Sequence, residues 1–342
     1  MTNTREATGQ AGRRGPLQEG ERVQITDTKG RMHTVTLVAG GQFQTSRGIL
    51  RHDDVLGGPD GAVIDAGEGR TFQVVRPLLA DYVLSMPRGA AIIYPKDSAQ
   101  VIAMGDIFPG ARVLESGVGS GGLALFLLSA IGESGSLVSV EKREDFAAIA
   151  AANVDLWFGA RPPQWDLVVA DLADQLQALH DQSFDRVVLD LLDPWSFTDG
   201  VSRVLAPGGV LVCYVTTVPQ MSRTVESLRD SGKFLEPVAW DSTNRTWHIE
   251  GLAVRPDHRM IAHTGYLITA RRKADGGREH KRVKHPAPAA EGSSGGWEED
   301  QEWSESSLGL RATSPKKVRR VRRDLETKVS RWVDPGEDQD DD

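Results

Sequence analysis

Hydrophobic and polar positions alternate with a period of two over the first part of the chain. Short runs such as 22–25 and 33–38 carry this alternation, and the Gly-containing segment 27–30 separates them. Such a pattern is typical of strands with one buried face that are joined by tight turns. Residues 17–76 are therefore predicted to form a small antiparallel β domain, and the polar residues 1–16 a flexible leader before it.

From residue 77 to residue 273, short apolar runs alternate with stretches of helical spacing. The apolar runs have no polar face, as is typical of buried parallel strands. They occupy residues 112–115, 137–140, 167–170, 186–189 and 210–215. The helical stretches cover residues 98–108, 121–131, 143–158 and 220–231. Repeated β-α alternation of this kind predicts a doubly wound α/β sheet.

The last part of the chain does not continue this alternation. Residues 246–252 and 263–269 are strand-like with no helical stretch between them, so we expect an antiparallel pair that closes the sheet. Beyond it, only eight of the 69 residues 274–342 are Leu, Ile, Val or Phe. That is too few for a core, and the segment is predicted to be a mostly disordered tail.

One part of the tail has the pattern of a basic amphipathic helix, near residues 315–331. Ser314 and Pro315 form a helix-start signature. Apolar side chains then recur every three or four residues, at Val318, Val321, Leu325, Val329 and Trp332. Residues 315–331 carry eight Lys or Arg, whereas 334–342 contain six acidic residues. Such a helix suits contacts with RNA phosphates, which we slightly favour, or docking on a neighbouring subunit.

Composition excludes several classes of protein. The 342 residues include 40 basic and 48 acidic side chains, and the net charge of −8 argues against a uniformly basic coat for nucleic acid. The single cysteine, Cys213, excludes a disulfide framework and a thiolate zinc cluster. The His residues show no ligand spacing, so we expect no metal. No apolar run approaches the roughly 18 residues that span a bilayer, so we expect a cytoplasmic protein without membrane contact.

A glycine-rich loop follows the first strand of the α/β region. Gly117, Gly119 and Gly122 lie between that strand and a predicted helix. Glycines at such a turn let a ligand approach the backbone, while the N–H groups of the helix point outward. The spacing also satisfies the G-x-G-x-x-G pattern of dinucleotide-binding proteins. The loop therefore indicates a nucleotide-type site without specifying the nucleotide.

Acidic residues near three successive strand ends favour S-adenosylmethionine. Glu115 would repel a diphosphate but suits the ammonium and sulfonium groups of this cofactor. Glu141 ends the next strand, where a carboxylate can accept hydrogen bonds from both ribose hydroxyls, and Asp171 could accept one from the adenine amino group. Each acid alone would fit a helix cap or a loop charge. Because ligands of open sheets bind at this edge, the three together outline an adenosyl pocket.

The fourth strand supplies the candidate chemistry. It ends at Asp190, and Asp193 is followed by Pro194 and Trp195. This resembles the acid-x-x-Pro-aromatic motifs of methylases that act on nucleobase nitrogens. Methyl transfer moves positive charge onto the accepting nitrogen, so a fixed anion beside it stabilises the transition state. We prefer Asp190 as that anion because it ends the strand directly; the alternative assigns the role to Asp193 and makes Asp190 a cap.

Several motifs in a fixed order resemble one family. They are Ile92-Ile93-Tyr94-Pro95-Lys96-Asp97, Glu115 with the glycine loop, Leu189-Asp190-Leu191-Leu192-Asp193-Pro194-Trp195, and His263-Thr264-Gly265-Tyr266-Leu267. Over residues 17–272 the chain resembles the bacterial and archaeal tRNA (adenine(58)-N(1))-methyltransferases, of actinobacterial-like type. The resemblance implies a class I S-adenosylmethionine-dependent methyltransferase, with a Rossmann-like seven-stranded sheet, an antiparallel C-terminal hairpin and a small N-terminal β domain. It also implies a homotetramer that methylates N1 of an adenine in the T-loop of tRNA.

The same resemblance implies roles for individual residues. Tyr94 would stack on the flipped base, and Asp190 would lie by its amino group and beside the cofactor. Glu141 would bind the ribose and Asp171 the adenine of S-adenosylmethionine. Phe146 falls where relatives often have His or another ring against the cofactor. The methionine part would be lined by Glu115, Gly117, Gly119, Ser120, Gly121, Gly122 and Leu123.

Other functions would share some of these features. A methyltransferase for another RNA nitrogen, a protein side chain or a small molecule would use a similar pocket, and the motif at 190–195 favours a nucleobase over them. A nicotinamide-dependent oxidoreductase could use the same glycines, but the sequence shows no second nucleotide site and no proton donor for it. A non-catalytic RNA-binding module would not need both Asp190 and Tyr94.

Overall fold

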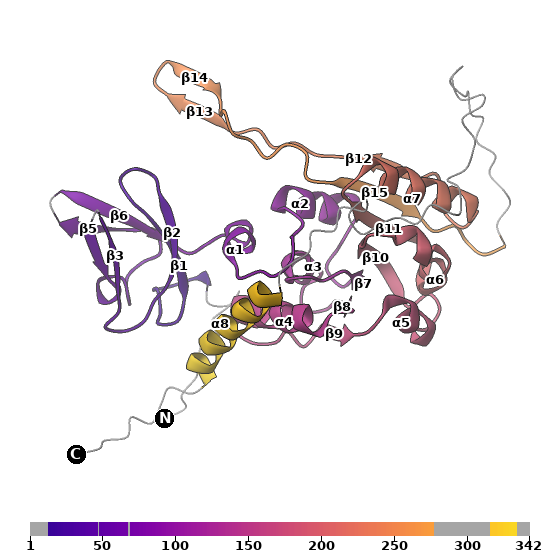
Figure 1. The fold of residues 1–342 in the computed structure, drawn as a ribbon, viewed down its shortest axis with the longest axis horizontal. Coiled ribbons are helices and arrows are strands. Elements are labelled where there is room, and N and C mark those ends of the chain that lie inside the picture. Colours follow the sequence, from indigo (N-terminus) through magenta and orange to yellow (C-terminus); the bar gives the residue numbers. More distant parts are fainter. Residues whose placement is uncertain (1–12, 47, 68, 277–314, 334–342) are drawn as a thin grey trace.

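The N-terminal part of the chain folds into a small antiparallel β structure (Figure 1). The computed structural model describes residues 13–46, 48–67, 69–276 and 315–333, the last with side chains up to residue 325. The sheet has the order β2-β1-β6-β5. Its strands are β1 (Arg22–Thr26), β2 (Met32–Thr36), β5 (Ala62–Gly67) and β6 (Arg70–Val75), and β3 (Gln42–Thr45), β4 (Gly48–Arg51) and the 3-10 helix η2 (His52–Asp54) lie beside it. The predicted first hairpin is confirmed, because β1 pairs with β2 in antiparallel register.

Residues just before this sheet are attached to it by hydrogen bonds. Residues 1–12 of the expected leader lie outside the described residues. Arg76 donates hydrogen bonds to the carbonyl oxygens of Gly15 and Pro16 at 3.0 and 2.9 Å. The same guanidinium pairs with Glu21 at 2.9 Å. Arg76 therefore ties residues 15 and 16 of the expected leader to the β structure.

A seven-stranded mixed sheet forms the second part of the molecule, in the order β12-β15-β11-β10-β7-β8-β9. Five of its strands are parallel to one another. These are β7 (Arg112–Ser116), β8 (Ser136–Glu141), β9 (Trp165–Val169), β10 (Phe184–Asp190) and β11 (Leu205–Val215). All five strands that the sequence predicts are thus confirmed as one parallel set, but β9 lies at the edge of the sheet, where only Trp165 is buried.

Helices cover both faces of this sheet, as a doubly wound fold requires (Figure 1). One face carries α1 (Leu79–Ser85), α2 (Pro95–Met104), α3 (Gly122–Ile131) and α4 (Glu144–Phe158). The other carries α5 (Leu172–Ala178), the 3-10 helix η3 (Pro194–Phe197), α6 (Thr198–Val204) and α7 (Val218–Asp230). The sequence does not predict α1, α5 or α6, because seven residues give too few positions to establish a helical period.

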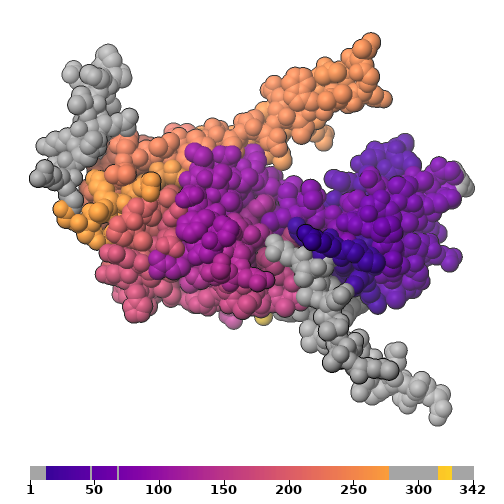
Figure 2. All heavy atoms as spheres, turned by 180° about the vertical axis from the view of Figure 1, so that it is seen from behind, coloured from indigo at the N-terminus to yellow at the C-terminus, as the bar shows by residue number. Residues whose placement is uncertain are grey.

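The predicted closing pair of strands has a different partner. Strand β15 (Tyr266–Arg271) does lie antiparallel to β11, but its other neighbour is β12 (Val238–Trp240). The strand-like residues at 247–250 form β13 (Trp247–Glu250), which pairs with β14 (Ala253–Pro256) in a separate hairpin. The expected pairing is therefore wrong. A period-two pattern marks a strand but not its partner, and this hairpin stands clear of the sheet as a projecting arm (Figure 2).

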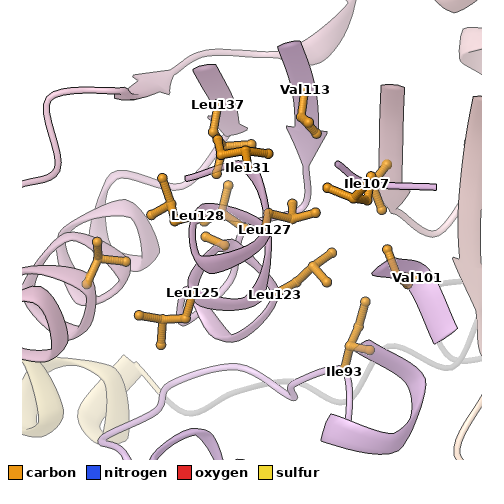
Figure 3. Packing of buried hydrophobic residues seen from close by; sticks show 14 of the residues in the cluster. Ile93, Val101, Ile107, Val113, Leu123, Leu125, Leu127, Leu128, Ile131 and Leu137 are labelled. Carbon is orange, nitrogen blue, oxygen red and sulfur yellow. The ribbon is translucent and has the colours of Figure 1, made fainter. Parts of the chain in front are cut away.

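Helix α3 fixes the glycine loop at the carboxyl edge of the sheet. Its residues Leu125, Leu127, Leu128 and Ile131 are at most 1% exposed. Figure 3 shows these side chains on several sides of the helix, with Leu127 and Ile131 beside Val113 and Leu137 of the strands. A helix that is apolar all round is held by the core rather than by solvent. The N-terminus of α3, immediately after the glycine loop, therefore has a fixed position.

The expected tail is described only in part. Residues 277–314 and 334–342 lie outside the described residues, and so do the side chains of Val329 and Trp332. Residues Pro315–Val333 form α8, which packs on α4 of the same chain (Figure 1). Within the described ranges no helix is long and apolar enough to cross a membrane. In those same ranges no three His, Cys, Asp or Glu side chains form a potential metal site.

Candidate active site

The glycine loop between β7 and α3 has a backbone that requires glycine. Gly117, Gly119 and Gly121 have φ values of 89°, 57° and 82°, which side chains rarely allow. A Cβ atom on Gly117 would lie 2.0 Å from the carbonyl oxygen of Asp190. The loop is therefore packed directly against the end of β10. The structure thus brings together the two motifs that the sequence predicts to hold the cofactor and to perform the chemistry.

Glu115 is a buried acid with one oxygen unpartnered. Its side chain is 1% exposed, and Oε2 accepts a hydrogen bond of 2.6 Å from Ser139 Oγ. Trp165 Nε1 in turn donates to Ser139 Oγ at 2.9 Å. Oε1 has no hydrogen-bond partner among the described residues. Burial raises the pKa of Glu115 to about 8, and the nearby Asp190 and Glu141 charges add to the shift. A cationic ligand group would satisfy this oxygen and restore the charged form.

Glu141 holds the glycine loop through both carboxylate oxygens. It accepts a hydrogen bond of 2.9 Å from the Gly119 N–H and one of 3.0 Å from the Arg143 N–H. Glu141 is 7% exposed and ends β8, as the sequence predicts. Its contact with a ribose stays a prediction, and the structure adds a role in shaping the loop.

Asp171, the third of the acidic residues predicted at the carboxyl edge of the sheet, lies in a different environment. Its side chain caps α5 by accepting from the Ala173 N–H at 2.9 Å. The Lys142 ammonium lies 2.8 Å from its other oxygen and, together with the cap, holds the pKa of Asp171 below its usual range. The helix-cap alternative that the sequence leaves open thus holds for Asp171. A contact with adenine stays a prediction.

Asp190 ends β10 and keeps its carboxylate available. Neither oxygen receives a hydrogen bond or an ion pair from the described residues. The residue is partly exposed, but its carboxyl group lies deep enough that burial, aided by the Glu141 charge, raises the pKa of Asp190 to about 7. Asp193 instead accepts a hydrogen bond of 2.9 Å from Ser196 Oγ within the η3 turn. Asp190 is thus the carboxylate of this motif that is free to accept from a ligand.

Tyr214 lies beside Asp190, and Tyr94 is near enough to Tyr214 to affect its pKa. Tyr94 is half-buried at the N-cap of α2, where its carbonyl oxygen accepts from the Asp97 and Ser98 N–H groups. Tyr214 of β11 is the register partner of Asp190. Burial, followed by the charges of Asp97, Asp190 and Tyr94, raises the pKa of Tyr214. The sequence analysis missed Tyr214, although an aromatic residue near the end of the strand after Asp190 was a usable signal.

A buried polar cluster joins the start of α2 to the base of the projecting arm. Asp97 is 0% exposed and lies 2.7 Å from the Lys96 ammonium. Ser242 Oγ donates to Asp97 at 2.8 Å, and Thr264 Oγ1 donates to its other oxygen. Lys96 also donates to the Ser242 carbonyl oxygen at 2.8 Å. The motifs Tyr94-Pro95-Lys96-Asp97 and His263-Thr264-Gly265 are far apart in the sequence. In the structure they form one unit, which includes Tyr94.

The remaining predicted residues have mainly structural contacts. Ser120 Oγ accepts from the Gly89 N–H at 3.2 Å and from the Ala90 N–H at 3.4 Å. Leu123 follows Gly122 in the first turn of α3, and its side chain belongs to the buried core. Phe146 lies on the first turn of α4 and packs against α8. Contacts of Leu123 and Phe146 with the cofactor stay predictions.

Two family models match the chain and together span most of both structural parts. One, described as TrmI-like N-terminal, matches residues 15–64, and the other, described as tRNA methyltransferase complex GCD14 subunit, matches residues 73–255. The tRNA (adenine(58)-N(1))-methyltransferase TrmI of Thermus thermophilus is 33% identical over 251 residues, which are 72% of this chain and 95% of that protein. The chain belongs to the TrmI-like tRNA methyltransferase family.

Further relatives of this TrmI-like chain include a second TrmI sequence and two solved structures. The tRNA (adenine(57)-N(1)/adenine(58)-N(1))-methyltransferase TrmI of Methanocaldococcus jannaschii is 30% identical and covers 67% of this chain and 88% of its own. The crystal structure of tRNA (m1A58) methyltransferase TrmI from Aquifex aeolicus aligns with a TM-score of 0.68 at 26% identity, covering 76% of this chain and 100% of that one. A Thermotoga maritima structure described as an S-adenosylmethionine-dependent O-methyltransferase aligns with a TM-score of 0.71 at 30% identity, over 77% of this chain and 96% of that one. The class I methyltransferase fold with an N-terminal β domain, as the sequence predicts, is therefore confirmed.

Proposed function

We propose that this chain methylates N1 of adenine 58 in the T-loop of tRNA, with S-adenosyl-L-methionine as the methyl donor. The observation that carries the proposal is the Asp190 carboxylate. The backbone of Asp190 packs against Gly117 of the glycine loop, and the carboxylate accepts no hydrogen bond from the described residues. The names of the Thermus and Aquifex relatives support the same reaction. A tRNA substrate would place the enzyme in the cytoplasm.

The residues at the carboxyl edge fit S-adenosylmethionine. Glu115 Oε1 is a buried oxygen without a partner among the described side chains, which suits the ammonium or sulfonium group. Gly117, Gly119 and Gly121 leave the loop backbone open to a ligand, and Ser120 lies in the same loop, with Gly122 and Leu123 at the start of α3. Glu141 and Asp171 would take the ribose and adenine, and Phe146 would lie at the rim. When bound, the cofactor supplies an electrophilic methyl group.

In the proposed reaction Asp190 accepts a hydrogen bond from the exocyclic N6 amino group of the target adenine. N1 of neutral adenine carries a lone pair and no proton, so no general base is required. The bond from sulfur to the methyl group breaks as the bond from N1 to the methyl group forms. Positive charge then moves onto the purine. The fixed Asp190 carboxylate therefore stabilises the transition state more than the ground state.

Tyr94 is proposed to hold the target base after it leaves the tRNA stack. Extruding a stacked base costs a few kcal/mol, which an aromatic face can offset by stacking. Tyr94 is half-buried at the N-cap of α2, and the Asp97 cluster anchors this turn. The backbone that carries the ring is therefore anchored in a turn with fixed hydrogen bonds rather than in a free loop.

The projecting arm supports the proposal that the enzyme is a homotetramer. On β13 and β14 the side chains of Trp247, Ile249 and Val254 are 55%, 73% and 57% exposed, and Leu252 at the turn is fully exposed. Figure 2 shows this arm standing away from the body of the molecule. Apolar side chains gathered on one projecting element are typical of surfaces that subunits cover. Size-exclusion chromatography with light scattering would test the assembly.

A second candidate is suggested by the Thermotoga relative, which is described as an O-methyltransferase. An oxygen acceptor would have to lose a proton during transfer, and Asp190 would then act as a base. The two candidates predict different products on the same RNA. N1 transfer gives N1-methyladenosine. Transfer to a ribose oxygen would give a ribose-methylated nucleoside, and an oxygen acceptor outside RNA would leave the tRNA unmethylated.

Mass spectrometry of nucleosides from treated tRNA separates these outcomes. The purified chain would be incubated with S-adenosylmethionine and an unmodified tRNA transcript, and with a matched transcript that carries guanine at position 58. We expect N1-methyladenosine from the first transcript and none from the second. Equal methylation of both transcripts, or methylation at ribose oxygen, would reject the proposal.

A further inference from the structure

Helix α8 has one face that is buried and one that is strongly basic. Val318 and Leu325 are each 1% exposed, and Val321 is partly buried beside them. These three residues are three or four positions apart and so share one side of the helix. The other side chains of this stretch are mostly Lys or Arg. The helix is therefore docked by its apolar side.

The docking surface is the first part of α4 in the same chain. Phe146 and Ile149 form a hydrophobic cluster with Val318 and Leu325. Figure 1 shows α8 beside α4. From the sequence we expect RNA phosphates or a neighbouring subunit as partners for this helix; the structure adds a contact of its apolar side with α4 of the same chain.

This contact lies next to the glycine loop. A Cβ atom on Gly89 would lie 3.1 Å from Ile149 and Phe146 atoms and 3.3 Å from Val318 Cγ2. The Gly89 N–H donates to Ser120 Oγ, within the loop, at 3.2 Å. Helix α8 is therefore placed at the edge of the sheet where the proposed reaction occurs.

The outer face of α8 concentrates positive charge on an acidic protein. Between Pro315 and Leu325 there are six basic residues against one acid, Asp324, although the whole chain has a net charge of −8. Five of these basic side chains line one open hollow, namely Lys316, Lys317, Arg319, Arg320 and Arg323. A dense group of cations on one exposed helix face suits a polyanion with regularly spaced charges.

We infer that α8 is an accessory arm that binds the phosphate backbone of the RNA substrate. The inference rests on the proposed function, because a tRNA at the Asp190 edge brings phosphates to the same side of the sheet. Phosphate contacts position a nucleic acid without selecting its sequence. Helix α8 would therefore strengthen tRNA binding without altering which adenine is methylated. It lies beyond residue 255, where the matching family model ends.

The test compares two pairs of lysines in the full-length protein. Lys316→Gln/Lys317→Gln removes two charges from α8. The control, Lys233→Gln/Lys273→Gln, removes two charges elsewhere on the protein. These two lysines are also neighbours, because the Lys273 backbone N–H donates to the Lys233 carbonyl oxygen at 2.8 Å. Binding to an unmodified tRNA transcript would be measured between about 50 and 200 mM salt. We expect the α8 variant to lower the salt slope by about one for each lysine that contacts a phosphate, and the control to retain it.

A salt slope equal to that of the wild-type protein in the α8 variant would overturn the inference, and would leave a protein partner as the alternative for this face. Equal losses in both variants would also overturn it, because the effect would then come from net charge alone. The nucleoside assay separates this result from failure of the proposed function. If the wild-type chain yields N1-methyladenosine while the slopes are equal, only the role of α8 is rejected.

Discussion

The carboxyl edge of the sheet contains two kinds of acidic residue. Near its centre, Glu115 is buried and Asp190 is partly exposed with its carboxyl group deep in the protein, and burial raises their pKa values to about 8 and about 7. Toward its outer end, Asp171 caps a helix and pairs with Lys142, and its pKa is lowered. The outer acid is already satisfied by the chain. The central pair has no cationic partner among the described residues, so its environment is completed only by a ligand.

This difference predicts opposite effects of pH on stability. Near pH 6 the folded protein holds protons on Glu115 and Asp190 that the unfolded chain has released. These two groups therefore make the cofactor-free protein less stable as pH rises from about 4 to about 8. Asp171 acts in the opposite direction, because its contribution is lost as pH falls through its lowered pKa. Carboxylates that weaken the free protein are typical of a functional site.

The largest effect is expected from Asp190→Ala. Removing the carboxylate leaves the developing charge on the purine without its fixed anion, so methyl transfer should fall by about 10²- to 10³-fold. Cofactor affinity should stay within a modest factor, because Glu115 and the glycine loop are intact. Single-turnover methylation and calorimetric titration measure the two quantities. Asp193→Ala is the matched control, and a greater loss of turnover in that variant would reverse the assignment.

Tyr94 should give the next largest effect. Stacking of one base on an aromatic ring contributes about 1–3 kcal/mol, so Tyr94→Ala should lower kcat/KM for tRNA by roughly 5- to 150-fold. Tyr94→Phe keeps the ring and should stay near the wild-type value. A loss in Tyr94→Phe as large as that in Tyr94→Ala would show that the hydroxyl, rather than the ring, carries the role.

Glu115→Gln separates stability from binding. At pH 8 the cofactor-free variant should melt at a higher temperature than the wild-type protein, because it no longer buries an ionising carboxyl; near pH 5 the two should agree. Cofactor affinity of the wild-type protein should weaken as pH falls below about 8, since a neutral Glu115 does not attract a cation. In the variant this dependence should be much flatter. Thermal melting and cofactor titration would be measured across pH for both proteins. The assignment would be contradicted if the variant and the wild-type protein showed the same dependence on pH.

The smallest effect is expected at Asp171. Asp171→Ala removes a helix cap that contributes about 1 kcal/mol and should lower both the melting temperature and, by a few-fold, cofactor affinity. Asp171→Asn keeps an acceptor at the cap and should lie close to the wild-type protein in both measurements. If Asp171→Asn lost as much cofactor affinity as Asp171→Ala, the charge rather than the hydrogen bond would be the relevant property.

The sequence predicts those parts of the molecule that depend on local patterns. Buried parallel strands produce continuous apolar runs, so their ends, with Glu115, Glu141 and Asp190, could be located. Contacts between distant segments give no local pattern. Asp97 meets Ser242 and Thr264, which are 145 and 167 residues away, and neither contact follows from periodicity. The docking of α8 on α4 was not predicted for the same reason. The partner of β13 was missed for another reason, since β14 follows it directly and a period-two pattern does not show which strand pairs with which.

The central claim is that the Asp190 carboxylate acts through the amino group of the target base. A double-substitution cycle tests it directly, using wild-type and Asp190→Asn protein with tRNA that carries either adenine or unsubstituted purine at position 58. Purine keeps the N1 lone pair but has no amino group to donate. Single-turnover rates should show that Asp190→Asn costs more with adenine than with purine, because only adenine loses the hydrogen bond from the amino group as well as the nearby charge. If the two losses simply multiplied, Asp190 and the amino group would act independently, and the account would be wrong.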